Sequence, residues 1–128
     1  AENLRHVLTA IEGHFITGYG DAEDSPDKQI ELKPEAAKHA ETFLRDHPDT
    51  RERFDRVADL IEGFETPFGM ELLSTVHWVA TREGATTADE AITETYAWND
   101  RKRMFKQDHV LIAWNVLDRK GWLAEPAE

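Results

Sequence analysis

The sequence has 128 residues, no cysteine and a formal net charge of −11, because 26 acidic side chains stand against 15 basic ones. This charge argues against free nucleic acid as a direct ligand, since nucleic-acid binding depends on cationic side chains that displace counterions. No apolar run approaches the ~20 residues of a membrane-spanning helix, and we expect no signal peptide before the fold.

Length and composition also bound the organisation of the chain. One domain over residues 1–128 is the natural interpretation of this length. The absence of cysteine fits a reducing compartment, so we expect a cytoplasmic protein. The chain does not begin with Met, and we therefore expect a fragment of a longer protein.

The first segment predicts a helix followed by a short strand pair. Helically spaced apolar residues indicate a helix that stops near Gly13, namely Leu4, Val7, Leu8 and Ile11. Residues 14–20 contain β-branched and aromatic residues typical of a strand, although their glycines also suit a loop. Residues 29–32 alternate polar and apolar side chains. We expect at most a small strand pair near Phe15 and Ile30.

An acidic loop separates these two strands. Residues 21–31 hold five acids and one lysine. Such a segment cannot bury enough apolar surface to order itself, so we expect it to be disordered or ordered by a partner. Its candidate contact residues are Asp21, Glu23, Asp24 and Asp27.

Two helices follow the acidic loop. Pro34 opens the first and Pro48 closes it, whereas Asp49 is expected to cap the second with Glu52 as its capping-box partner. The apolar residues of both helices should face a core: Ala36, Ala37, Ala40, Phe43, Leu44, Phe54, Val57, Ala58 and Ile61.

The second of these helices carries an acidic stripe. Glu52, Asp55, Asp59 and Glu62 are spaced three, four and three residues apart, which places them on one flank. Successive carboxylates then stand about 4.5–6 Å apart along the axis, a spacing comparable with phosphates along a nucleic-acid strand. The alternative is a solvated face that is supported by ion pairs such as Glu52–Arg56.

The central helix begins at Thr66–Pro67, because Thr is a strong N-cap and Pro suits the first helical position. Its apolar stripe contains Leu72, Leu73, Val76 and Val79. Trp78 lies on the other side, roughly 160° from the centre of that stripe. We expect the helix to be buried on two faces, with Trp78 as either a second packing surface or an aromatic anchor for a partner.

The C-terminal part predicts two more helices joined by a basic loop. Thr87 and Glu90 form a capping box for the first, and the second runs from about Gln107 to a stop at Gly121. The loop, residues 99–106, could belong to a winged-helix-like DNA binder. In so acidic a chain, its four bases more often pair with the protein's own carboxylates. The fold class is therefore mainly α, a compact bundle of about five or six helices.

No pattern in the sequence indicates catalysis or metal binding. The histidines form no His-Glu-x-x-His pair, and the chain has neither a Gly-x-Ser-x-Gly elbow nor a Gly-rich phosphate loop. Ser74 and His77 lie three residues apart and could hydrogen-bond, but such a pair is more often structural. We therefore expect no enzyme, no catalytic or metal-binding residues and no cofactor.

Several of these blocks together resemble the C-terminal domain of DarG-type antitoxins. The resemblance runs across nearly the whole chain, and residues 64–78 are its most specific part. The similar blocks are Gly13–Asp21, Gly63–Leu73, His77–Val79, Ala97–Asn99 and Gly121–Leu123.

The resemblance implies a partner and a mechanism. Proteins of this family join a macro domain, which removes ADP-ribose from DNA, to a domain that blocks the toxin DarT. DarT ADP-ribosylates thymidine in single-stranded DNA. The resemblance thus implies a DarT-like toxin as the partner. Together with the acidic charge of the chain, it leads us to expect that this chain occupies the basic DNA site of the toxin by mimicking DNA. The candidate contacts are the acids of the loop and of the stripe, with Trp78 as a candidate aromatic anchor. The alternative is a winged-helix-like DNA-binding or regulatory domain.

Overall fold

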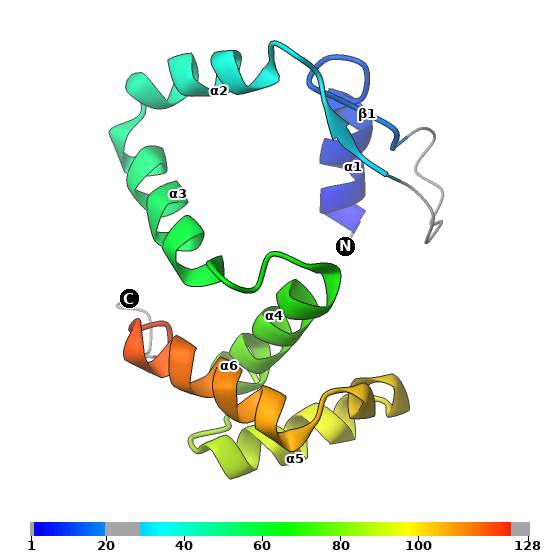
Figure 1. The fold of residues 1–128 in the computed structure, drawn as a ribbon, viewed down its shortest axis with the longest axis vertical. Coiled ribbons are helices and arrows are strands. Elements are labelled where there is room, and N and C mark those ends of the chain that lie inside the picture. The colour runs from blue at the N-terminus through cyan, green and yellow to red at the C-terminus, as the bar shows by residue number, and fades with distance from the viewer. Residues whose placement is uncertain (1, 20–28, 124–128) are drawn as a thin grey trace. The chain divides into compact units, whose positions relative to one another are not determined.

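In the computed structural model, residues 2–19 and 29–123 are described, and within them the chain is mainly helical (Figure 1). The mainly α prediction is thereby confirmed. The contacts divide the chain into two compact units, residues 1–53 and 54–128. The elements are α1 (Glu2–Ile11), β1 (Ile16–Thr17), β2 (Glu31–Leu32), α2 (Ala36–Arg45), α3 (Pro48–Ile61), α4 (Pro67–Thr81), α5 (Ala88–Trp98), the 3-10 helix η1 (Asp100–Met104) and α6 (Gln107–Arg119).

The first unit contains the predicted strand pair. β1 and β2 are antiparallel, with Ile16 opposite Leu32 and Thr17 opposite Glu31. Gly18, directly after β1, has a φ of +97°, and a Cβ there would lie 2.0 Å from the carbonyl oxygen of Gln29. Only glycine therefore allows the two backbones to approach so closely.

The boundaries and burial of α2 and α3 correct two predictions. α3 begins at Pro48 rather than after an Asp49 cap, because the missing N–H of proline costs nothing in the first helical turn. Of the predicted core residues, Ala36 is buried, but Phe43, Phe54 and Val57 are exposed. An amphipathic stripe is buried only when a second apolar surface faces it, and the exposure of these three side chains shows that no described residue covers them fully.

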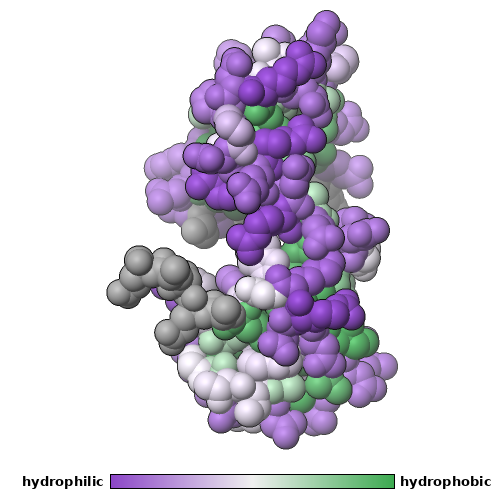
Figure 2. Space-filling view, turned by 90° about the vertical axis from the view of Figure 1, so that its left-hand side faces the viewer, coloured by the Kyte–Doolittle hydropathy of each residue, from purple (hydrophilic) through white to green (hydrophobic). Residues whose placement is uncertain are grey.

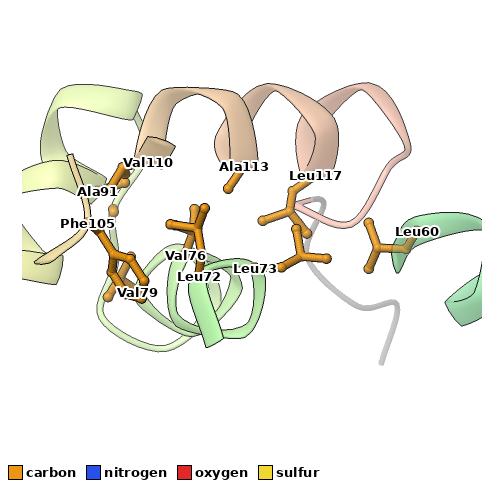
Figure 3. Packing of buried hydrophobic residues seen from close by; sticks show 11 residues of the cluster. Leu60, Leu72, Leu73, Val76, Val79, Ala91, Phe105, Val110, Ala113 and Leu117 are labelled. Atoms are coloured by element: carbon orange, nitrogen blue, oxygen red, sulfur yellow. The ribbon is translucent and has the colours of Figure 1, made fainter. Parts of the chain in front are cut away.

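The second unit is built on α4, α5 and α6, which contact one another. Figure 3 shows side chains of α4 and α6 facing one another between the two helices, with Leu60 reaching the same cluster from the end of α3. The predicted apolar stripe of α4 is confirmed, because its four members are all buried: Leu72, Leu73, Val76 and Val79.

The helix starts of this unit follow the predicted caps. Thr66 Oγ1 accepts a hydrogen bond of 2.9 Å from the N–H of Gly69, with Pro67 next in the chain. Thr87 Oγ1 accepts one of 3.2 Å from the N–H of Glu90. The Glu90 carboxylate reaches one residue further back than in a standard capping box, to the N–H of Thr86 at 2.7 Å.

No strand is assigned within residues 54–123, so this part of the structure has no sheet that could form a wing. None of the described helices is long and apolar enough to cross a membrane.

Candidate functional site

The predicted contact residues of the acidic loop, Asp21, Glu23, Asp24 and Asp27, lie outside the described residues. Their role in binding stays a prediction.

The acidic stripe is exposed. Glu52 belongs to the first unit and the other three acids to the second, and all four side chains are open to solvent. Figure 2 shows mostly hydrophilic residues over the visible face of α2 and α3. Asp59 is partly neutralised, because Lys120 Nζ lies 3.5 Å from its carboxylate and donates to its carbonyl oxygen at 2.6 Å. Exposure leaves the stripe accessible to a basic partner.

Trp78 corrects the expectation that α4 is buried on two faces. Trp78 is 47% exposed. The ring of Trp78 packs instead on that of Trp98, with centroids 6.5 Å apart and planes at 41°. Its Nε1 donates to a carboxylate oxygen of Glu83 at 3.3 Å. Trp78 is therefore partly packed against Trp98 and partly exposed, and its role as an anchor for a partner stays a prediction.

A groove of about 310 Å³ lies between α4 and α5, at this pair of tryptophans. Trp78 and Trp98 form two of its walls, and both are 47% exposed. Glu83 and Glu94 also line it, together with Val79 and Ala97. Trp98, Glu83 and Glu94 are not among the candidate residues predicted from the sequence. Glu94 and Trp98 are four residues apart on one helix, and this spacing could have placed these two residues on one face.

The basic loop between α5 and α6 pairs with the protein's own carboxylates. Arg101 makes a two-pronged contact with Glu71, and Lys102 Nζ lies 2.9 Å from the same carboxylate. The hydrogen bond from Arg101, and then the charge and hydrogen bond of Lys102, outweigh burial and lower the pKa of Glu71 to about 2. Arg103 Nε lies 3.9 Å from Asp100. The bases of the loop that the DNA-binding alternative would need are thus largely engaged within the chain.

Ser74 and His77 do not act as a hydrogen-bonded pair. Ser74 Oγ donates to the carbonyl of Glu71 at 3.1 Å, and the ring of His77 meets that of Trp122 edge-on at 6.1 Å. Partial burial lowers the pKa of His77, against the effect of a hydrogen bond with the Trp122 backbone. The hollow beside them, about 180 Å³, is lined mainly by apolar residues: Leu60, Ile61, Met70, Leu73, Leu117 and Trp122.

Comparison with known proteins identifies relatives of this chain. It is 45% identical over 123 residues to the DNA ADP-ribosyl glycohydrolase of Thermus aquaticus, an alignment that covers 96% of this chain and 34% of that protein. It is 36% identical over 125 residues to the DNA ADP-ribosyl glycohydrolase of Mycobacterium tuberculosis, which covers 93% of this chain and 35% of the relative. This chain is homologous to part of the DNA ADP-ribosyl glycohydrolases. No family model matches the sequence.

The homology confirms the predicted resemblance to DarG-type proteins. The chain spans about a third of the length of the curated relatives that it matches. Statements about the whole relative therefore do not transfer directly to this segment.

The expectation that the chain is not an enzyme is contradicted by these names. The relatives carry the name of an enzyme, a glycohydrolase, whereas the expectation rests on the absence of a known catalytic motif from this sequence. A motif search recognises only residue patterns that lie close together in sequence, so it is a weak basis for such an exclusion.

Proposed function

We propose that this chain is the toxin-binding domain of a DarG-type antitoxin, and that it neutralises a DarT-like toxin that ADP-ribosylates single-stranded DNA. The observation that carries the proposal is the 45% identity to a DNA ADP-ribosyl glycohydrolase over 96% of this chain. The chain corresponds to only about a third of that protein. A segment of this size, with its own helical core, is suited to hold a partner.

The charge of the chain supports a mechanism in which the domain occupies the DNA site of the toxin. An enzyme that acts on DNA presents cationic side chains to the phosphates. Residues 1–65 of this chain hold 16 acidic and 8 basic side chains, a net charge of −8, whereas residues 66–128 hold 10 and 7. A surface of this sign attracts the same cationic cleft that attracts DNA, and it accelerates the encounter.

The proposed contacts are the acidic loop and the acidic stripe. Within the stripe we expect Asp59 to contribute less, because Lys120 already lies beside its carboxylate. Removing one partner of a fully desolvated charge pair costs ~2–5 kcal/mol, whereas a charge at the rim mainly changes the association rate.

Two charge-reversal variants locate the contact. One carries lysine at the four loop positions Asp21, Glu23, Asp24 and Asp27, and the other at the four stripe positions Glu52, Asp55, Asp59 and Glu62. The readouts are binding kinetics with the toxin, inhibition of its ADP-ribosylation of single-stranded DNA, and competition by that DNA.

A matched control carries the same change of charge elsewhere, with lysine at Glu2, Glu35, Asp46 and Asp118, which are all exposed. At least one candidate variant should bind the toxin more weakly than this control, and substrate DNA should displace the parent chain. DNA mimicry is excluded if both candidate variants bind like the control and DNA does not compete.

A further inference from the structure

The groove between α4 and α5 suggests one specific contact with the partner. This inference rests on the proposed function. The groove is formed by two half-exposed indole rings and two carboxylates, and its described lining includes no basic residue. We propose that the groove receives an arginine side chain of the toxin, with the guanidinium against the faces of Trp78 and Trp98 and paired with Glu94.

The aromatic walls have the geometry for a planar cation. Their centroids are 6.5 Å apart and their planes are inclined by 41°, so the rings form an open wedge rather than a closed stack. The face of an indole ring carries negative charge density, and among aromatic side chains Trp binds cations best, with arginine the more frequent partner. A guanidinium is also weakly hydrated, so it enters an aromatic groove more readily than an ammonium ion.

The rings already attract cations within this chain. The Arg82 guanidinium lies 5.8 Å from the centroid of Trp78, and Lys102 Nζ lies 4.9 Å from that of Trp98. Neither of these two residues lines the groove. Each ring thus has one cation near it, whereas the charged residues that line the groove itself are the acids Glu83 and Glu94.

The two carboxylates differ in what they offer a ligand. Glu83 accepts the Trp78 indole N–H at 3.3 Å, which holds that residue at the edge of the groove. Glu94 is partly buried, and no ion pair joins it to another residue in the described ranges. A half-buried carboxylate gains most from a cationic partner that brings paired donors, as arginine does.

A nucleobase is the competing occupant, because single-stranded nucleic acid also stacks on exposed tryptophans. The charge of the groove argues against it: a base brings its phosphates close to Glu83 and Glu94 in a chain of net charge −11. The observations therefore favour a basic protein side chain.

The test uses the chain with two probes. The first probe is the toxin, titrated against the parent, Glu94→Gln, Trp98→Leu and the control Asp118→Asn, which makes the same change of charge at an exposed site on α6. The second is the peptide acetyl-Gly-Arg-Gly-amide, compared with its uncharged citrulline analogue, while the indole N–H signals of Trp78 and Trp98 are followed by NMR.

We expect Glu94→Gln and Trp98→Leu to weaken toxin binding by roughly three- to thirtyfold, the range that corresponds to a cation on an aromatic face. Asp118→Asn should bind like the parent. The arginine peptide should shift both indole signals, and the citrulline peptide should not. Thermal unfolding checks each variant, and Glu94→Gln keeps the test decisive if Trp98→Leu does not fold.

The failures of the two proposals are distinguishable. If the toxin binds the parent and both groove variants equally, the groove proposal is overturned and the proposed function stands. If the toxin does not bind the parent at all, the proposed function is wrong. The proposal of a toxin arginine in the groove is then wrong as well, even if the arginine peptide shifts the indole signals. If oligothymidylate shifts the indole signals and the arginine peptide does not, the groove is a base-stacking platform and the proposal is wrong.

Discussion

Lys102 places its ammonium nitrogen 2.9 Å from a carboxylate oxygen of Glu71, in a position where only 8% of Lys102 is exposed. The same nitrogen donates to Thr75 Oγ1 at 3.1 Å and lies 4.9 Å from the centroid of the Trp98 ring. A buried charge without a partner is strongly destabilising, so this pair ties η1 to α4. It also fixes the end of α5, where Trp98 borders the groove.

Removal of the Glu71 charge should destabilise the chain. Glu71→Gln leaves Lys102 buried without its carboxylate, and we expect a loss of roughly 1–3 kcal/mol in the free energy of unfolding, the cost of an unsatisfied buried group. Chemical denaturation measures it. The double variant Glu71→Gln, Lys102→Met should lose less than the sum of the two single variants, because it removes the buried charge together with its partner. Additive losses would show that the pair is not coupled.

The same pair predicts a pH dependence. The folded-state pKa of Glu71 is about 2, below its ordinary value of 4.5, so the unfolded chain binds more protons in the interval between them. The contribution of Glu71 is therefore complete above the unfolded-state pKa and is lost as pH falls through this interval. The difference in unfolding free energy between the parent and Glu71→Gln should shrink over this interval. A difference that stays constant from pH 6 to the acid limit contradicts the assignment.

Leu72 tests the core of the second unit. It is 4% exposed on α4, so Leu72→Ala should cost roughly 2–5 kcal/mol of unfolding free energy through lost burial and a residual cavity. Leu111→Ala is the matched control, since Leu111 is 43% exposed on α6. Denaturant titration of both variants gives the comparison. Equal losses for the two, or a loss below about 1 kcal/mol for Leu72→Ala, would show that α4 is peripheral.

Gly69→Ala should destabilise the chain, although replacing a helical glycine by alanine usually stabilises a protein. Gly→Ala within a helix ordinarily stabilises by roughly 0.5–1 kcal/mol. A Cβ at Gly69 would lie 2.6 Å from the carbonyl oxygen of Phe64, which is backbone and cannot move aside freely. We therefore expect Gly69→Ala to lower the melting temperature. Ser74→Ala, at an exposed site on the same helix, should leave it nearly unchanged, and a Gly69→Ala variant as stable as the parent would place the 64–69 turn differently.

Association with the toxin should slow as salt rises. Screening shortens the Debye length from about 10 Å at ~0.1 M to about 3 Å at ~1 M, which removes the long-range attraction of the exposed acids. The association rate should fall while the dissociation rate changes less. Stopped-flow mixing at several salt concentrations measures both rates. An association rate that does not depend on salt would leave the acidic surface without a role in the encounter.

The local features of this protein can be predicted from its sequence. The caps at Thr66 and Thr87 and the apolar stripe of α4 arise from contacts within a few residues along the chain, so their spacing is visible in the sequence. The strand pair can be predicted for a similar reason, since both strands have local β-forming patterns. The relationship to DarG-type proteins can also be recognised from the sequence, because it depends on residue identities alone.

Which apolar and charged faces are covered by a partner depends on the packing of the whole chain. The spacing of Phe54 and Val57 predicts a buried stripe equally well whether or not a second surface covers it, and here both are exposed. The sequence predicts that the bases of residues 99–106 pair with the protein's own carboxylates, but only the structure identifies Glu71 as the partner of Lys102 and shows that Lys102 is buried. The Trp78–Trp98 groove joins residues of two helices. Periodicity reports only the face of a single helix, whereas burial and charge pairing depend on what folds against that face.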